Sequence, residues 1–225
     1  MSNTAIILGA GNSTRMKSEK SKLLLEINGK TVIERSVNAF LSISDIDEII
    51  VVVRECDVET FSNLLPDSRV SFVIGGDTRQ QSVKNAVDTV DDGEYIIIHD
   101  GARPLVNPDD IERTLIAAEE YGAAAVGVPV KDTIKQVDSH GIVVSTPDRS
   151  SIVAIQTPQI FKIDLYKSAL EKAQKEGMDF TDDCQLIEYF GKKVKTVVGS
   201  YDNIKITTPD DIPLAESLLN KQLNK

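Results

Sequence analysis

The sequence has no tryptophan, only two cysteines and two histidines, and few aromatic residues overall. Cys56 and Cys184 lie far apart without a Cys-x-x-Cys spacing, which argues against a disulfide framework and against a zinc site. We expect two free, half-buried thiols instead. Acidic residues outnumber basic residues by 35 to 25, which gives a formal net charge of -10. Because phosphate backbones favour a basic surface, this charge argues against a nucleic-acid-binding protein.

Long apolar runs are also lacking. Met1 is followed by a polar segment, residues 2–4, and then directly by a short apolar run without a preceding basic region. We therefore expect neither a signal peptide nor a transmembrane helix, and a cytoplasmic location. The 225 residues, 41% hydrophobic and 27% charged, suit one globular domain spanning residues 1–225.

Short apolar runs alternate with segments of helical periodicity. The runs at 48–53 and 95–99 are apolar almost throughout, as in parallel strands covered on both faces. The alternation predicts an α/β fold with a doubly wound, mostly parallel, Rossmann-like sheet. Other strands are expected at 5–8, 70–74, 123–130, 153–156 and 193–198, and helices at 31–41, around 83–90, from Asn107 as N-cap, at 165–175, at 182–190 and from Thr208 as N-cap.

The alternation breaks at residues 131–151. Two short stretches of alternating polarity flank Ser139–Gly141 there, which is typical of a β-hairpin. We therefore predict a protruding β-arm at about 131–151 rather than another βα unit.

A Gly-rich segment, Gly9-Ala10-Gly11, follows the first predicted strand. Small residues allow backbone N–H groups to approach phosphate oxygens closely. A dinucleotide fingerprint would need a third glycine where Thr14 stands, so this motif fails as one. Arg15 and Lys22 follow, and two cations suit a triphosphate. A tight βα turn with solvated charges explains the motif equally well.

The run at 95–99 ends in His99-Asp100-Gly101-Ala102-Arg103-Pro104. Open α/β sheets bind ligands at such strand ends, and Asp100 there is suited to Mg²⁺, which takes carboxylate and phosphate oxygens. Arg103 would pair with a phosphate or with Asp100. We interpret His99 as a partly buried histidine with satisfied hydrogen bonds rather than as a catalytic group.

Two weaker motifs remain. Gly76, Asp77 and Ser82 belong to a Gly-rich segment after the strand at 70–74, where backbone groups could contact a base. The alternative is a plain βα turn capped by Asp77. Lys205 lies between Ile204 and Ile206, an alternation typical of an exposed lysine on an edge strand. Asp202 lies nearby and would be a second metal contact or an ion-pair partner.

Taken together and in order, these motifs resemble the 2-C-methyl-D-erythritol 4-phosphate cytidylyltransferase family over nearly the whole chain. The resemblance implies a Rossmann-like nucleotidyltransferase that uses CTP and Mg²⁺ to place CMP on a polyol phosphate in non-mevalonate isoprenoid synthesis. The matching segments are GAGNSTRM with Lys22, GGDTRQQS, HDGARP, Asp132–Lys135, Asp148-Arg149, Gln156–Phe161, Thr181–Asp183 and DNIKITTPDD.

The resemblance also implies residue roles. Arg15 and Lys22 would bind the triphosphate and stabilise charge on the α-phosphoryl group. Arg149 and Lys205 would position the substrate phosphate. The nucleotide-binding residues would be Gly9, Ala10 and Gly11 in the first loop, and Gly76, Asp77 and Ser82 beside the cytosine. The polyol-binding residues would be Asp100, Arg103, Thr133 and Thr157, with Thr157 near the substrate phosphate.

In this family the arm exchanges between two subunits. The resemblance therefore implies a homodimer in which Thr133 and Arg149 would serve the partner's active site. Two departures affect the first loop: Ser13 stands where glycine is common, and Ser21-Lys22-Leu23 replaces Pro-Lys-Gln.

Three alternatives stay open. A ribitol-5-phosphate cytidylyltransferase shares the chemistry, but Gly101-Ala102 favours the methylerythritol enzyme. A Rossmann dehydrogenase is disfavoured by the missing third glycine. A catalytically silent regulator would bind CTP without releasing pyrophosphate.

Overall fold

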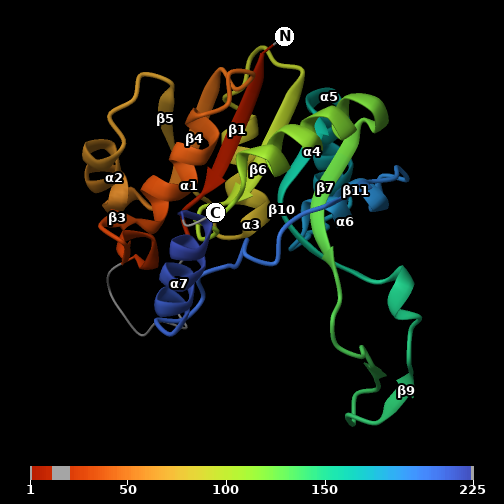
Figure 1. Cartoon of the computed structure of the whole chain (residues 1–225). Coiled ribbons are helices and arrows are strands. Elements are labelled where there is room, and N and C mark those ends of the chain that lie inside the picture. Colours follow the sequence, from red (N-terminus) through yellow and green to blue (C-terminus); the bar gives the residue numbers. More distant parts are fainter. Residues whose placement is uncertain (1, 12–20, 224–225) are drawn as a thin grey trace.

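The computed structural model of the chain describes residues 2–11 and 21–223. Its centre is a seven-stranded sheet of order β11-β7-β10-β6-β1-β4-β5 (Figure 1). Neighbouring strands are parallel except where β10 pairs antiparallel with β6 and β7, which confirms the mostly parallel α/β fold. The strands are β1 (Asn3–Leu8), β4 (Glu48–Val53), β5 (Val70–Ile74), β6 (Tyr95–Asp100), β7 (Ala123–Pro129), β10 (Val153–Lys162) and β11 (Lys195–Val198).

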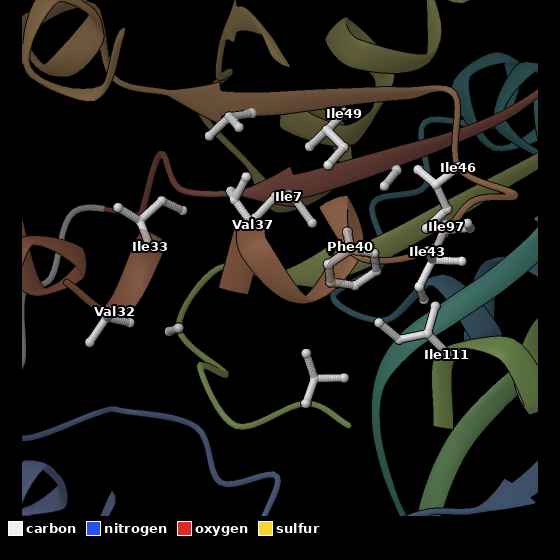
Figure 2. Close-up of a cluster of buried hydrophobic side chains, with 14 of the residues drawn as sticks. Ile7, Val32, Ile33, Val37, Phe40, Ile43, Ile46, Ile49, Ile97 and Ile111 are labelled. Carbon is white, nitrogen blue, oxygen red and sulfur yellow. The ribbon is translucent and has the colours of Figure 1, made fainter. Parts of the chain in front are cut away.

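Helices cover both faces of the sheet. Ile6 and Ile7 are neighbours in β1 and point to opposite faces, where each joins a separate hydrophobic cluster. Ile7 packs with Val37 and Phe40 of α1 (Figure 2), whereas Ile6 shares its cluster with residues of α3, α5 and α6. The helices are α1 (Val32–Leu41), α2 (Val58–Leu64), α3 (Arg79–Val87), α4 (Pro108–Tyr121), α5 (Ile163–Lys175), α6 (Asp183–Tyr189) and α7 (Asp211–Leu223).

The helix ends follow local sequence rules. The predicted N-cap Asn107 is confirmed, because its side chain accepts from the Asp109 N–H with Pro108 in the first turn. The predicted start of the last helix at Thr208 is wrong. The helix begins at Asp211, whose carboxylate accepts from the Thr207 and Thr208 N–H groups.

Two other predictions are corrected. The segment around Lys205 is not an edge strand, because residues 203–207 have no regular secondary structure. The Ile206 N–H instead donates to the carbonyl of Ala102, 2.8 Å away, which attaches this segment to the end of β6. The thiols are not half-buried, since Cys56 is exposed and Cys184 is buried.

The β-arm extends away from the body between β7 and β10 (Figure 1). It carries the short strands β8 (Gln136–Val137) and β9 (Val143–Ser145), which pair antiparallel as the hairpin prediction requires. A second short pair, β2 (Glu26–Ile27) and β3 (Lys30–Thr31), precedes α1. Within residues 2–11 and 21–223, no helix combines the length and apolar character needed to cross a membrane.

Candidate active site

A cavity of about 510 Å³ lies at the carboxyl ends of β1, β4, β5 and β6. This is the edge at which parallel α/β sheets bind ligands. Its lining mixes backbone from Gly-rich loops with charged side chains. The described lining residues are Leu8–Gly11, Lys22, Leu23, Val53–Glu55, Ile74–Arg79, Ser82, Asp100, Ala102 and Lys205.

The loop after β5 packs so closely against the loop after β1 and against α3 that glycine is required at two positions. A Cβ atom on Gly75 would lie 2.4 Å from the Cβ of Ala10, and one on Gly76 would lie 2.1 Å from the Cγ of Gln81. The Gly76 N–H donates to the hydroxyl of Ser82, 3.0 Å away, and this bond joins the loop to α3. The helix is capped by Thr78, not by Asp77 as the alternative interpretation held. The loop therefore presents backbone to the cavity at close range.

Lys22 enters the cavity from a 3-10 turn at Lys22–Leu24. The hydroxyl of Ser21 accepts from the Leu23 N–H and begins this turn. The Lys22 ammonium donates to the carbonyl of Ile206 at 2.7 Å, so it lies beside the segment that carries Lys205. The other predicted triphosphate ligand, Arg15, lies outside the described residues, and its role stays a prediction.

Asp100 is the electrostatic centre of the site. Its Oδ2 atom lies 2.8 Å from the Lys205 ammonium and 3.7 Å from Nε of Arg103, and its Oδ1 atom lies 4.0 Å from Nε of Arg79. Burial raises the pKa of Asp100, but Lys205 and Arg79 outweigh it and lower the pKa to about 2. The carboxylate therefore stays ionised and holds three cations at one edge of the cavity.

Arg79 was not among the residues predicted for the site. One signal was available, because Arg79 is the first residue of α3 and a cation at a helix N-terminus is unfavourable without a compensating anion. Arg103 was predicted as a partner of Asp100 and does lie near it. Its guanidinium also donates to the carbonyl of Asn203 at 2.7 Å.

Thr157 and His99 lie beneath Asp100 and are almost fully buried. The Thr157 hydroxyl accepts from the Asp100 N–H at 3.0 Å and lies 3.0 Å from Nδ1 of His99. The other ring nitrogen, Nε2, faces the carbonyl of Arg103 at 3.2 Å. Because a carbonyl can only accept, Nε2 carries the proton and Nδ1 accepts from Thr157. His99 is thus the satisfied histidine that the sequence indicated, although it is fully rather than partly buried.

His99 makes a testable contribution to stability. Burial lowers the pKa of His99 from 6.5 to about 4. Between these two pH values the imidazole is protonated in the unfolded chain but neutral in the folded protein. We expect the free energy of unfolding to fall as the pH falls from about 6.5 to 4, by at most about 3 kcal/mol. His99→Gln should remove this pH dependence in urea unfolding measured between pH 7 and pH 4. Equal slopes for the two proteins would contradict the assignment.

The described side chains do not form a magnesium cage. Within residues 2–11 and 21–223, no cluster of three or more His, Cys, Asp or Glu could hold a metal ion. Both carboxylate oxygens of Asp100 face cations, and Asp202 is not among the described cavity residues. Mg²⁺ usually takes one or two carboxylates together with substrate phosphates and water. A metal ion here would need phosphate oxygens from a nucleotide, and Asp100 as its ligand stays a prediction.

The two arm residues are separated from the cavity. Thr133 and Arg149 are exposed on the arm, and neither is among the described cavity residues. The Arg149 guanidinium donates to the carbonyl of Lys131 at 3.1 Å. The base of the arm is held by Tyr201, whose hydroxyl donates to the carbonyl of Pro129 at 2.7 Å and whose ring lies under the Lys131 ammonium. One chain thus assembles Lys22, Lys205 and Asp100 but not the arm residues.

The fold and this site define a class of protein. Gly-rich loops at the carboxyl ends of parallel strands, with lysines beside them, are the features of a Rossmann-like α/β enzyme that binds phosphorylated nucleotides. The comparisons with known proteins give the particular family. The model of the 2-C-methyl-D-erythritol 4-phosphate cytidylyltransferase family matches residues 3–221. The chain belongs to this family of nucleotidyltransferases.

Individual relatives and solved structures point to the same family. The chain is 47% identical to the enzyme of that name from Caldanaerobacter subterraneus, over 98% of this chain and 100% of the relative. A crystal structure of 4-diphosphocytidyl-2C-methyl-D-erythritol synthase from Anaerococcus prevotii has a TM-score of 0.88 at 34% identity and covers 97% of this chain and 96% of its own. The Thermus thermophilus structure of the cytidylyltransferase has a TM-score of 0.79 at 30% identity, covering 98% and 100%. The resemblance inferred from the sequence is confirmed, and it favours the methylerythritol enzyme over the ribitol alternative.

Proposed function

We propose that this protein transfers CMP from CTP to 2-C-methyl-D-erythritol 4-phosphate, with CDP-methylerythritol and pyrophosphate as products. The observation that carries the proposal is the cavity in which Lys22, Lys205 and Asp100 meet two Gly-rich loops. Such an arrangement offers backbone N–H groups and ammonium groups to phosphates. We propose one nucleotidyltransferase domain over residues 1–225, working in the cytoplasm.

The chemistry needs no strong base. A phosphate oxygen of the polyol phosphate attacks the α-phosphorus of CTP in line, a new P–O bond forms, and the bond to the bridging oxygen breaks as pyrophosphate leaves. A phosphate monoester is already largely ionised near neutral pH, so the buried neutral His99 is consistent with this route. Lys22 and Arg15 neutralise charge on the reacting phosphoryl group, and catalysis comes from positioning and electrostatics.

The cavity divides between two substrates. The triphosphate lies on the backbone of Gly9, Ala10 and Gly11. The cytosine lies against the second loop, where Gly76, Asp77 and Ser82 form the wall. Asp100 would hold Mg²⁺ together with oxygens of the triphosphate, and the ion would supply positive charge beside the reacting phosphoryl group.

The polyol phosphate lies toward Lys205 in this proposal. Asp100 lines its site, and Arg103 lies beside Asp100 outside the described cavity residues. Thr157 supports the site from below through its hydrogen bond to the backbone of Asp100. Thr133 and Arg149 would complete the site, and the distance of the arm from the cavity suggests that they come from a second subunit.

We therefore propose a homodimer in which the arms exchange. The arm exposes several large apolar side chains, which a monomer would leave in water. They are Ile134, Val137, Ile142, Val143 and Val144 on the arm itself, and Val153 and Ile155 at its return into β10.

Turnover with purified components tests the proposal. We expect pyrophosphate release and a CDP-polyol product from CTP, Mg²⁺ and methylerythritol phosphate, with a much lower kcat/KM on ribitol 5-phosphate. Comparable or higher kcat/KM on ribitol 5-phosphate would support the alternative enzyme. CTP binding with no pyrophosphate release on either polyol phosphate would indicate a silent regulator.

A further inference from the structure

The motif Thr181–Asp183 matched the family, but the chemistry proposed above does not use its acidic residues. Asp183 is the first residue of α6 and its side chain is 3% exposed. Its Oδ2 atom lies 2.5 Å from Nη1 of Arg79, and its Oδ1 atom accepts from the Tyr166 hydroxyl at 2.5 Å. A carboxylate this deeply buried requires partners, and it has both a cation and a hydroxyl.

Arg79 connects this buried group to the cavity. One side of its guanidinium contacts Asp183, and Nε lies 4.0 Å from Asp100. Burial opposes the charge of Arg79, but the two carboxylates outweigh it and raise its pKa above the ordinary value. The cation is therefore fixed between an anion behind the cavity and the anion at its edge, while it lines the cavity itself.

The residues on either side of Arg79 are attached to the same region. The Thr78 hydroxyl donates to the carboxylate of Asp179 at 2.9 Å. The side chain of Gln80 donates to the carbonyl of Met178 at 3.0 Å and accepts from the Phe180 N–H at 2.9 Å. Three consecutive residues at the start of α3 thus bind residues 178–183. These contacts hold the end of the loop that forms the proposed cytosine wall.

We propose that Arg79 is a positioning residue for nucleotide selection, held by Asp183, which itself accepts from the Tyr166 hydroxyl. It fixes the loop at residues 75–78 against α6 and holds the Asp100 carboxylate toward the cavity. A loop fixed in this way keeps its backbone hydrogen-bonding groups at set positions, and discrimination between two pyrimidine bases depends on such positions. The inference rests on the proposed function, because it assumes that the base lies on this loop.

Asp183→Asn tests the inference. Asparagine has nearly the same shape and can still accept from Tyr166, but it lacks the charge that holds Arg79. We expect the KM for CTP to rise about tenfold and the ratio of kcat/KM for CTP over UTP to fall about tenfold. The KM for the polyol phosphate should change less, because Lys205 and Arg103 still hold the Asp100 carboxylate. In an Arg79→Gln background the same substitution should have no further effect on the ratio, because the two residues act as one unit.

Asp110→Asn is the matched control. Asp110 is also a nearly buried carboxylate in the first turn of a helix and pairs with Arg113, but it lies on α4 away from the described cavity residues. It should cost similar stability and leave the CTP/UTP ratio unchanged. If Asp183→Asn lowers the thermal midpoint as the control does but leaves the ratio and the KM unchanged, the inference is wrong.

A second variant keeps the inference testable if Asp183→Asn does not fold. If Asp183→Asn gives no folded protein, Arg79→Lys keeps the charge but shortens the reach and removes the fork, and it should lower the ratio similarly. An unchanged ratio in a folded Arg79→Lys protein would overturn the inference. Wild-type protein that fails to turn over CTP with methylerythritol phosphate would instead refute the proposed function.

Discussion

Lys22→Ala should reduce turnover by on the order of 10²–10³ while the protein stays folded, by analogy with loss of a preorganised oxyanion donor. The ammonium lines the cavity and lies beside the segment that carries Lys205. Charge develops on the phosphoryl group in the transition state, so the loss should appear mainly in kcat and less in the KM for CTP. A CTP-dependent pyrophosphate-release assay measures it.

Two further variants separate charge from structure. Lys22→Gln keeps a donor on the side chain but removes the charge, and it should be nearly as inactive as the alanine variant. Lys30→Ala removes an exposed lysine of β3 from another part of the surface and should leave kcat unchanged. Near-normal turnover by Lys22→Ala, with circular dichroism and the thermal midpoint as in wild type, would refute the role of Lys22.

The sheet was the most predictable part of the molecule. The bounds predicted for β4 and β5 agree with the structure, because short runs rich in β-branched and aromatic residues favour extended conformation. The N-cap at Asn107 was equally predictable, because it depends only on neighbouring residues, Pro108 and Asp109. By contrast, the alternation at residues 204–206 predicted a strand that does not exist. Ile206 is buried and its N–H donates to the carbonyl of Ala102 after β6, and no strand among the described residues pairs with the segment.

The site was predictable only in part. Motifs identified Lys22, Asp100 and Lys205, but the 2.8 Å contact that joins Asp100 to Lys205 spans 105 positions and leaves no local pattern. The same reason explains why Arg79 was missed, since Asp183 lies more than a hundred residues away. Spacing in sequence identifies which residue types can act on phosphates, whereas their pairing depends on how the sheet brings its strand ends together.

Mixing two inactive variants should restore activity if the arms exchange between subunits. In a heterodimer of Lys22→Ala and Arg149→Ala chains, one site would carry both lesions and the other would carry neither. In a random mixture of symmetric dimers, heterodimers are about half of the population, so about a quarter of all sites should be intact. The expected recovery is therefore about a quarter of wild-type turnover, from parents that are each nearly inactive.

The positions of Lys22 and Arg149 within one chain are the reason for this expectation. Lys22 lines the cavity, while Arg149 is exposed on the arm and binds the carbonyl of Lys131. The mixture must be unfolded and refolded together, because arms that have already exchanged would not mix otherwise. Refolding each parent alone gives the background. If Arg149 acted within its own chain, every site in the mixture would keep one lesion, and turnover would stay at that background.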